Sequence, residues 1–410
     1  MRRSKRLQRP EPGPQPQPGS PADPSPDLDP SWLATVRRAL LDWYDREGRA
    51  ELPWRRDRDP YKVLVSEVML VQTTVAAAGP FFERFLARFP TPEALASADE
   101  ADVLKAWEGL GYYRRARLLH QAARAIVERH DGRVPGDPDA LRSLPGVGRY
   151  IAGAVASIAF DLPEPILEAN SQRVLARWLR WAEDVRSPAS QARLWQAATR
   201  VVSPEDPGRL NQAIMDLGAT VCTARSPRCL ACPVAEDCLA RRDGLQDDLP
   251  KRSAPIPPLE VSESCLLAVD DRRRFLVVRR GVGRLWEGFW EFPTIHLSGV
   301  DPAGRGSGEG LADPLDHRFR ALTGVSLAIG PPVHTLRYAV TKHRVTLSAI
   351  AATPIGGAPT PGPGLSAVAW RPMAELDALP RTGATRRLSL WASSHPEALA
   401  GPATDHPSSA

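Results

Sequence analysis

The segment LPGVGRYIAGAVASIAF occupies residues 144–160 and joins a glycine turn to a run of small, helix-compatible residues. Gly146 and Gly148 allow a tight turn that leaves backbone N–H groups free at the start of the following helix. Such free amides bind a phosphate without the help of a side-chain cation. Leu144 and Val147 supply apolar side chains that pack a hairpin of this kind. The segment therefore predicts a helix-hairpin-helix phosphate site, with an ordinary glycine corner between two helices as the alternative.

Helical periodicity extends on both sides of this hairpin. Residues 29–45 (DPSWLATVRRALLDWYD) and 102–130 (DVLKAWEGLGYYRRARLLHQAARAIVERH) are amphipathic at the helical repeat. Strand-like alternation is scarce, so we predict a mostly α domain over residues 31–246. Residues 1–30 are dominated by Pro, Gly, Gln and Ser, a composition that cannot bury enough apolar surface to order the chain, and we expect a disordered tail there.

The character of the sequence changes after residue 246. Residues 247–258, DDLPKRSAPIPP, are rich in proline and charge, and we assign residues 247–261 to a linker. The short runs CLLAVD, FLVVRR, HRVTLSAI and LSAVAW then suggest strands, with helical pieces around Leu315 and Met373. We predict an α+β domain over residues 262–395 and a second disordered tail over residues 396–410.

Length and charge limit the class of protein. A chain of 410 residues is too long for one ordinary core, so two or three domains are expected. The net charge of +5 and the pI of about 9.1 suit a polyanionic partner. No run of 18 apolar residues is present, and the start MRRSKRLQRP is not followed by an apolar signal core. We therefore expect a cytoplasmic protein without a membrane segment.

Four of the five cysteines lie within one short stretch. Cys222, Cys229, Cys232 and Cys238 have the spacing C-x6-C-x2-C-x5-C, which lets four thiolates converge on one inorganic core. A structural zinc usually takes two separated short-spaced pairs, whereas only one C-x2-C pair is present here. We predict a [4Fe-4S] cluster, with zinc as the alternative. Cys265 lies outside this array and is expected to be a buried apolar residue.

Several motifs in this order resemble those of one enzyme family. LPWR, YKVLVSEVMLVQTTV, GLGYYRRAR, the hairpin, PILEANSQRVLAR, NQAIMDLGATVC and the cysteine loop are similar to the adenine DNA glycosylase (MutY-type) branch of the helix-hairpin-helix glycosylase superfamily. This resemblance covers residues 32–245, and LWEGFWEFP resembles the branch's C-terminal Nudix-like domain. It implies two helical lobes with a cleft between them. The implied activity is hydrolysis of the N-glycosidic bond of adenine mispaired with 8-oxoguanine or guanine in duplex DNA, by a nucleoid-associated monomer.

The chemistry requires a proton donor for the base and a carboxylate for the sugar cation. Glu67 lies in the apolar helix VLVSEVML, where burial disfavours the charged form and retains a proton, although a solvent-facing glutamate fits the periodicity equally well. The resemblance implies that Glu67 protonates adenine and then activates water. It places the second carboxylate at Glu168, where the family has Asp followed by Gly and this chain has Glu followed by Ala169.

The same resemblance implies roles for further residues. Tyr150 stands where related lyases carry a nucleophilic lysine, so no Schiff base is expected there. Tyr150 and Asn170 are implied to orient the second carboxylate, and Val71 replaces a glutamine of the family. The residues implied to contact the extruded adenine, or to fill the space it leaves, are Arg55, Gln72, Thr73, Leu110, Tyr112 and Gln212. Tyr112 also fits an ordinary core aromatic.

The C-terminal domain is expected to read the opposite base. The helix DPLDHRFRALTGV carries none of the paired glutamates that Nudix hydrolases use for magnesium, so pyrophosphate hydrolysis is not expected. The family's Phe-Ser-His strand motif corresponds to Val340, Thr341 and Lys342, and Thr341 keeps the hydroxyl. Because of these departures, a glycosylase of shifted specificity and a catalytically weak mismatch-binding protein remain alternative functions.

Overall fold

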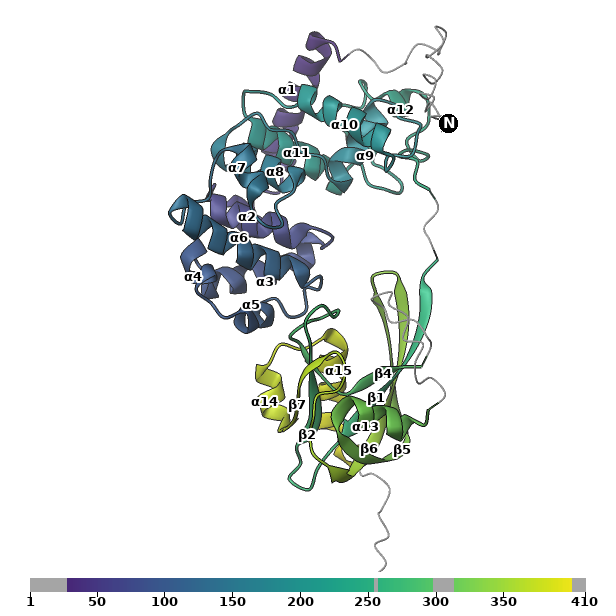
Figure 1. The fold of residues 1–410 in the computed structure, drawn as a ribbon. Coiled ribbons are helices and arrows are strands. Elements are labelled where there is room, and N and C mark those ends of the chain that lie inside the picture. The colour runs from purple at the N-terminus through teal and green to yellow at the C-terminus, as the bar shows by residue number, and fades with distance from the viewer. Residues whose placement is uncertain (1–27, 254–256, 298–312, 400–410) are drawn as a thin grey trace, which may run out of the picture.

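The computed structural model of the chain describes residues 28–253, 257–297 and 313–399. These residues form a helical domain followed by a domain of strands and helices, as Figure 1 shows. The predicted combination of a mostly α domain and an α+β domain is confirmed. Most of the two predicted tails lies outside the described residues, but α1 begins at Pro30 and a 3-10 helix (η3) ends at Leu399.

The helical domain contains the following elements: α1 (Pro30–Glu47), the 3-10 helix η1 (Pro53–Arg55), α2 (Pro60–Leu70), α3 (Val75–Arg88), α4 (Pro92–Ala96), α5 (Glu100–Ala106), α6 (Arg114–His130), α7 (Pro138–Ser143), α8 (Arg149–Phe160), α9 (Ala169–Trp178), α10 (Pro188–Val201), α11 (Pro207–Thr220), the 3-10 helix η2 (Cys229–Ala231) and α12 (Leu239–Arg242). None of the helices described is both long and apolar enough to cross a membrane.

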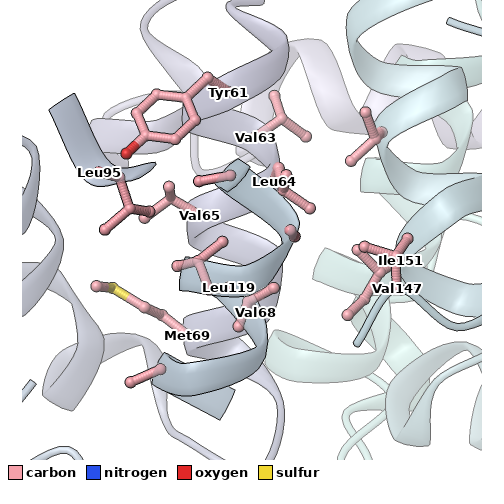
Figure 2. Close-up of a cluster of buried hydrophobic side chains, with 14 of the residues drawn as sticks. Tyr61, Val63, Leu64, Val65, Val68, Met69, Leu95, Leu119, Val147 and Ile151 are labelled. Carbon is pink, nitrogen blue, oxygen red and sulfur yellow. The ribbon is translucent and has the colours of Figure 1, made fainter. Parts of the chain in front are cut away.

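Two hydrophobic cores divide these helices into two lobes. The core of the first lobe takes its side chains mainly from α2–α8, and the core of the second lobe from α1 and α9–α11. Figure 2 shows the middle of the first core, where α2 side chains such as Leu64 and Val68 lie beside Leu119 of α6 and Ile151 of α8. The chain therefore starts in the second lobe, builds the first and then returns.

One predicted helical run is broken in the structure. The expectation of helix throughout residues 102–130 is wrong, because α5 ends at Ala106 and α6 begins only at Arg114. Gly109 and Gly111 have φ angles of 103° and 77°. These positive angles do not occur within a right-handed helix, and glycine adopts them readily. Tyr112 follows with a φ of 49° and is about half exposed. The amphipathic period continues across this turn and hides it from a periodicity analysis.

The C-terminal domain is built from two sheets with helices beside them. Its elements are β1 (Leu259–Ala268), β2 (Phe275–Arg280), β3 (Trp290–Glu291), β4 (Thr294–His296), α13 (Leu315–Thr323), β5 (Val325–Val340), β6 (His343–Gly357), β7 (Leu365–Arg371), α14 (Met373–Ala378), α15 (Gly383–Ser394) and η3 (Pro396–Leu399). The strand orders are β4-β1-β6-β5 and β3-β2-β7. Strands β1 and β6 pair in parallel, and the other neighbours pair antiparallel.

The predicted strands and helical pieces of this domain are present, and the structure adds others. Three of the four apolar runs lie within β2, β6 and β7, and the fourth, CLLAVD, extends two residues beyond the end of β1 at Ala268. Helices α13 and α14 include Leu315 and Met373. Strand β1 begins inside the stretch expected to be linker. Of β5, which contains two prolines, the sequence analysis predicted only the end near Val340, and it missed α15.

A loop of the C-terminal domain packs into the first lobe. Phe289, between β2 and β3, is fully buried and belongs to the first lobe's core. Its ring centroid lies 4.3 Å from that of Tyr113, directly after the turn between α5 and α6. Nearby, Lys105 Nζ donates to the carbonyl oxygen of Asp377 at 2.7 Å. The C-terminal domain thus completes the packing beneath this turn.

We predict that Phe289→Ala destabilises the first lobe, although Phe289 is far from it in sequence. Truncation of a buried phenylalanine typically costs about 3–5 kcal/mol. Amide hydrogen exchange should therefore become faster in residues 103–119. The matched control is Phe319→Ala, since Phe319 is equally buried but lies in the C-terminal domain's own core. Faster exchange in residues 103–119 with the control alone would contradict this assignment.

Candidate active site

A cavity of about 500 Å³ lies between the two lobes. It receives side chains from η1, α2, the start of α8, the start of α9 and α11. The polar residues in its wall include Arg49, Arg55, Ser66, Glu67, Thr73, Thr74, Tyr150, Glu168, Asn170 and Gln212. The two candidate carboxyl groups, which are about a hundred residues apart in the chain, therefore share one cavity.

Glu67 is held in the cavity wall by α2. The helix starts at Pro60, and the Asp59 side chain before it accepts hydrogen bonds from the N–H groups of Tyr61 and Lys62. Glu67 is only 3% exposed, so the interpretation as a solvent-facing residue is wrong. Burial raises the pKa of Glu67 to about 7, against the opposing effects of the Tyr150 hydrogen bond and the Arg55 charge.

Tyr150 contacts the first carboxyl group. Its hydroxyl donates a hydrogen bond to Glu67 Oε2. The sequence analysis expected Tyr150 to orient the second carboxylate, but the side-chain hydrogen bond that the structure shows goes to the first. Burial raises the pKa of Tyr150 well above its ordinary value, so the phenol remains a donor.

Glu168 caps the helix that follows it. Glu168 Oε1 accepts a hydrogen bond from the N–H of Ser171, and Oε2 accepts one from the N–H of Asn170, each at 2.8 Å. The Ser171 hydroxyl in turn accepts from the N–H of Glu168, which completes a capping box at α9. Burial raises the pKa of Glu168, and the two amide donors, which favour its charged form, offset only part of that increase. Glu168 is thus an integral part of the cavity and not an exposed acid on the helix.

The replacement of glycine by Ala169 leaves the backbone in an ordinary conformation. Ala169 is the first residue of α9 and is exposed, and its φ is not positive. Any residue with helical preference fits such a position. A glycine would be needed here only if the backbone were crowded or left-handed, and at Ala169 it is neither.

Asn170 and Gln212 are fixed by the second lobe. Asn170 Oδ1 accepts a hydrogen bond from Arg173 Nη2 at 2.8 Å, so the Asn170 side chain is tied to its own helix. Gln212 Oε1 accepts from the Tyr44 hydroxyl at 3.2 Å. Both residues line the cavity, as does Thr73, whose hydroxyl accepts from Arg115 Nη2 at 3.0 Å.

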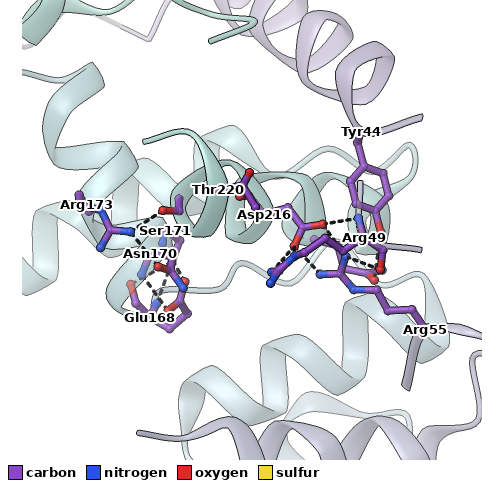
Figure 3. Close-up of polar contacts among 11 residues, drawn as sticks. Tyr44, Arg49, Arg55, Glu168, Asn170, Ser171, Arg173, Asp216 and Thr220 are labelled. Atoms are coloured by element: carbon purple, nitrogen blue, oxygen red, sulfur yellow. Dashed lines mark hydrogen bonds and ion pairs between the residues drawn. The ribbon is translucent and has the colours of Figure 1, made fainter. Parts of the chain in front are cut away.

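A buried carboxylate that sequence reasoning missed lies behind the cavity. Asp216 on α11 is completely buried and binds Arg49 and Arg55, both of which line the cavity, as Figure 3 shows. Arg49 Nε donates to Asp216 Oδ1 at 2.9 Å and Arg55 Nη2 to the same oxygen at 2.8 Å. Burial acts to raise the pKa of Asp216, but the Arg55 and Arg49 hydrogen bonds outweigh it and lower the pKa. The only sequence signal was a lone aspartate in the apolar segment NQAIMDLGA.

Gln72 and Tyr112 lie outside the cavity, on neighbouring exposed turns. Both have positive φ angles, 59° and 49°. Arg115 joins the turns, because it donates to the carbonyl oxygens of Val71 and of Gly111, at 2.5 and 3.4 Å. The half-exposed Tyr112 ring does not fit the core-aromatic interpretation.

Leu110 and the glycine hairpin differ in their exposure. Leu110 is 7% exposed and belongs to the core of the first lobe. Gly146, with a φ of 78°, and Gly148, the N-cap of α8, are exposed. A Cβ at Gly146 would lie 2.6 Å from the Leu118 Cβ, so only glycine fits this turn. The turn leads directly into the start of α8, where no side chain caps the free backbone N–H groups.

The four clustered cysteines face a common small pocket. Cys222, Cys229, Cys232 and Cys238 all line it, beside Arg177, whose Nη1 lies 3.2 Å from Cys222 Sγ. In the part of the chain that the structure describes, no three His, Cys, Asp or Glu side chains approach closely enough to hold a single metal ion. Convergence on one pocket fits an iron–sulfur cluster held by the four thiolates, and Cys265 lies fully buried elsewhere.

Thr341 lies in the C-terminal domain, in a hairpin and not within a strand. The expectation that Val340, Thr341 and Lys342 lie in one strand is wrong, because β5 ends at Val340 and β6 begins at His343. Thr341 and Lys342 are exposed in this turn, and His343 is buried. The described structure does not bring Thr341 into the cavity lining.

Comparison with known families defines the class of protein. Residues 65–199 match the HhH-GPD superfamily of base excision DNA repair proteins. Residues 222–238 match the iron–sulfur binding domain of endonuclease III, and this range starts and ends at the first and last clustered cysteines. The chain is therefore a helix-hairpin-helix base excision repair protein with an iron–sulfur loop and an α+β C-terminal domain.

Individual relatives identify the family. Adenine DNA glycosylase of Rattus norvegicus is 36% identical over 75% of this chain and 69% of its own length. The enzyme of Mus musculus is 34% identical over 82% and 74%, and that of Mycolicibacterium smegmatis is 44% identical over 48% and 66%. The solved structure of a thermostable thymine-DNA glycosylase is 27% identical, with a TM-score of 0.49, over 53% of this chain and all of that one. The chain belongs to the adenine DNA glycosylase family, which removes adenine from mispairs.

We predict that the purified protein is brown and contains about four irons per chain. Cys232→Ser removes one of the four thiolates, so iron content and visible absorption should fall together. Cys265→Ser, which changes the cysteine outside the array, is the matched control and should leave both unchanged. Iron, zinc and sulfide analysis measures this, and stoichiometric zinc in a colourless wild-type protein would contradict the cluster.

Proposed function

We propose that this chain hydrolyses the N-glycosidic bond of adenine opposite 8-oxoguanine or guanine in duplex DNA and leaves the DNA strand intact, acting as a monomer. The observation that supports this proposal best is the contrast between two carboxyl groups in one cavity. Glu67 is buried in an apolar wall, where a proton is retained near pH 7, and Glu168 accepts two backbone N–H groups that stabilise an anion. An acid and an anion in one site are what base removal requires.

The proposed reaction uses the two groups in sequence. Glu67 gives its proton to a ring nitrogen of the extruded adenine, so that the base leaves as a neutral molecule when the bond to the sugar breaks. The Glu168 carboxylate stabilises the positive charge that develops on the sugar. The Glu67 carboxylate then takes a proton from water as the water oxygen bonds to the sugar carbon, which restores the acid. Tyr150 holds Glu67 in place throughout.

The cavity wall supports hydrolysis without strand cleavage. The residues that line the cavity include arginines but no lysine, so no ordinary amine nucleophile is present among them. Lyase chemistry needs an amine that forms a Schiff base with the sugar, and the cavity lining contains no such amine. Arg55 and Gln212 are proposed to contact adenine, and Gln72 and Tyr112 to occupy the space that it leaves in the duplex.

The C-terminal hairpin is proposed to contact the opposite base. Thr341 is exposed in the turn between β5 and β6, and its hydroxyl lies 3.4 Å from His343 Nδ1. An exposed hydroxyl on a rigid turn can hydrogen-bond an oxidised guanine. The cysteine loop would hold the [4Fe-4S] cluster through its four thiolates, and a bound cluster would crosslink the loop next to α9 without entering the base-removal chemistry.

Single-turnover base release on a panel of mispairs tests this proposal. We expect adenine release opposite 8-oxoguanine and guanine, little release opposite cytosine or thymine, and strand breaks only after alkali. Release of another base would favour the same fold with shifted specificity. Tight binding to the mispair without base release would favour a mismatch-binding protein, and covalent trapping by borohydride would contradict the hydrolytic mechanism.

The pH dependence should follow the protonation of Glu67. Since the pKa of Glu67 is about 7 and only its protonated form can donate, the single-turnover rate constant should fall about tenfold per pH unit above that value. Glu67→Gln should abolish release at every pH while mispair binding persists. Rate constants measured from pH 5 to 9 with enzyme in excess provide the check, and a rate that still rises between pH 7 and 9 would exclude Glu67 as the acid.

Removal of the Glu168 charge should slow the chemical step. We expect Glu168→Gln to lower the single-turnover rate at least about 100-fold, as the loss of one preorganised electrostatic partner typically does, with DNA affinity retained. Glu164→Gln is the matched control, because Glu164 is also half-buried but does not line the cavity. Glu168→Asp tests whether the cavity fits the longer side chain of glutamate. A lower single-turnover rate in the Asp variant would indicate that it does. A wild-type rate for Glu168→Gln would remove this residue from the mechanism.

A further inference from the structure

Asp216 is a buried charge that the two-carboxyl mechanism does not use. Its side chain is completely inaccessible, yet five donors converge on it. Arg49 contributes its backbone N–H at 3.0 Å, its Nε at 2.9 Å and its Nη2, and Arg55 contributes Nη1 at 2.5 Å and Nη2 at 2.8 Å. Figure 3 shows the two guanidinium groups on either side of the carboxylate. A carboxylate fully occupied in this way has no capacity left for substrate.

The arrangement joins the two lobes at the cavity. Asp216 lies on α11, and two other residues of this helix, Leu210 and Leu217, belong to the core of the second lobe. Arg55 lies in η1, next to Trp54 of the first core. Arg55 is itself largely buried, with 7% of its side chain exposed. Without Asp216, two cations would face a cavity that must accommodate a cationic sugar.

We propose that Asp216 is a positioning residue of the active site, which fixes Arg49 and Arg55 on the cavity wall and cancels part of their charge beside Glu67. Its contribution rests on the function proposed above, because it acts through the proton on Glu67. The two arginines and Asp216 together carry one positive charge, whereas the arginines alone carry two.

Other charged and titratable groups around Glu67 come from several elements. Tyr150 reaches it from α8, Glu168 lies at the start of α9, and Arg55 lies in η1. From α6, Arg115 binds the carbonyl oxygens at the C-terminal end of α2. Of these groups, the Arg55 charge favours the carboxylate form of Glu67, and the Glu168 charge favours its protonated form.

The sign of the expected effect follows from this balance. If Asp216 loses its charge, the uncompensated arginines favour the ionised form of Glu67, and its proton is lost at a lower pH. An opposite charge within about 4–6 Å changes a carboxyl pKa by about 1–3 units, and the arginines are already present, so we expect the smaller end of that range. A purely structural residue would lower the rate by the same factor at every pH.

The experiment compares pH profiles of single-turnover adenine release in the full-length, cluster-containing protein. Asp216→Asn keeps the shape of the side chain and should move the basic limb down by about one pH unit, which is about a tenfold lower rate at pH 8 and less than about threefold at pH 6. The double variant Asp216→Asn, Arg49→Gln should return the basic limb of the pH profile toward its wild-type position. Glu291→Gln is the matched control, since it removes a buried carboxylate that pairs with Arg280 in the C-terminal domain, and it should leave the limb in place.

Two further measurements keep the outcome decisive. Arg49→Gln alone should move the limb to higher pH, which tests the idea if Asp216→Asn does not fold. Infrared absorption of the protonated Glu67 carboxyl, identified by its loss in Glu67→Gln, reports the same titration without catalysis. A lower titration midpoint in Asp216→Asn supports charge compensation even if Glu67 is not the catalytic acid. An unmoved basic limb and unmoved midpoint in both Asp216→Asn and Arg49→Gln overturn it.

Discussion

The join between the two lobes determines everything that the active site can do. Each lobe has its own hydrophobic core, so the cavity between them is held by contacts that α11 makes across the boundary. Gly208 lets α11 approach α8 so closely that a Cβ there would lie 2.5 Å from the Ser157 carbonyl oxygen. Asn211 Nδ2 donates to Ser157 Oγ at 2.9 Å, and one turn further Asp216 binds its two arginines. This edge of α11 is closely packed, polar and shielded from solvent. Charges interact more strongly in such surroundings than they do in water.

The position of each side chain within its helix explains how Glu67 and Glu168 can have opposite roles in the proposed mechanism. Glu67 projects from the middle of a helix whose amide groups are already paired, so burial dominates and its proton is retained. Glu168 projects from a helix start, where unpaired N–H groups are available, and both of its oxygens use them. The difference therefore comes from position within a helix and not from residue type. A glutamate can be an acid in the first place and a stabilising anion in the second.

Local patterns in the sequence predicted the features that depend on local geometry. The hairpin glycines, four strands of the C-terminal domain and the cysteine array all follow from residues a few positions apart. Asp216 could not be found in this way, because its partners lie more than 160 residues earlier and the choice between free and paired aspartate is made by tertiary packing. Phe289 was missed for the same reason. The break before α6 was hidden because the apolar period is continuous on both sides of Gly109 and Gly111.

The capping geometry also bears on the exchange of the family's aspartate for Glu168. An aspartate at an N-cap reaches the second and third amides of the helix with its short side chain. Glu168 is one methylene longer, yet its two oxygens lie 2.8 Å from the same kind of amides, so the extra length is taken up by the side chain curling back over the helix start. The carboxylate is therefore placed by the amides that bind it, and less by the length of the side chain. Since Ala169 adopts ordinary helical geometry, no compensating change in the backbone is needed. In the proposed mechanism, an anion fixed in this manner is available to stabilise a sugar cation despite the exchange of Asp for Glu.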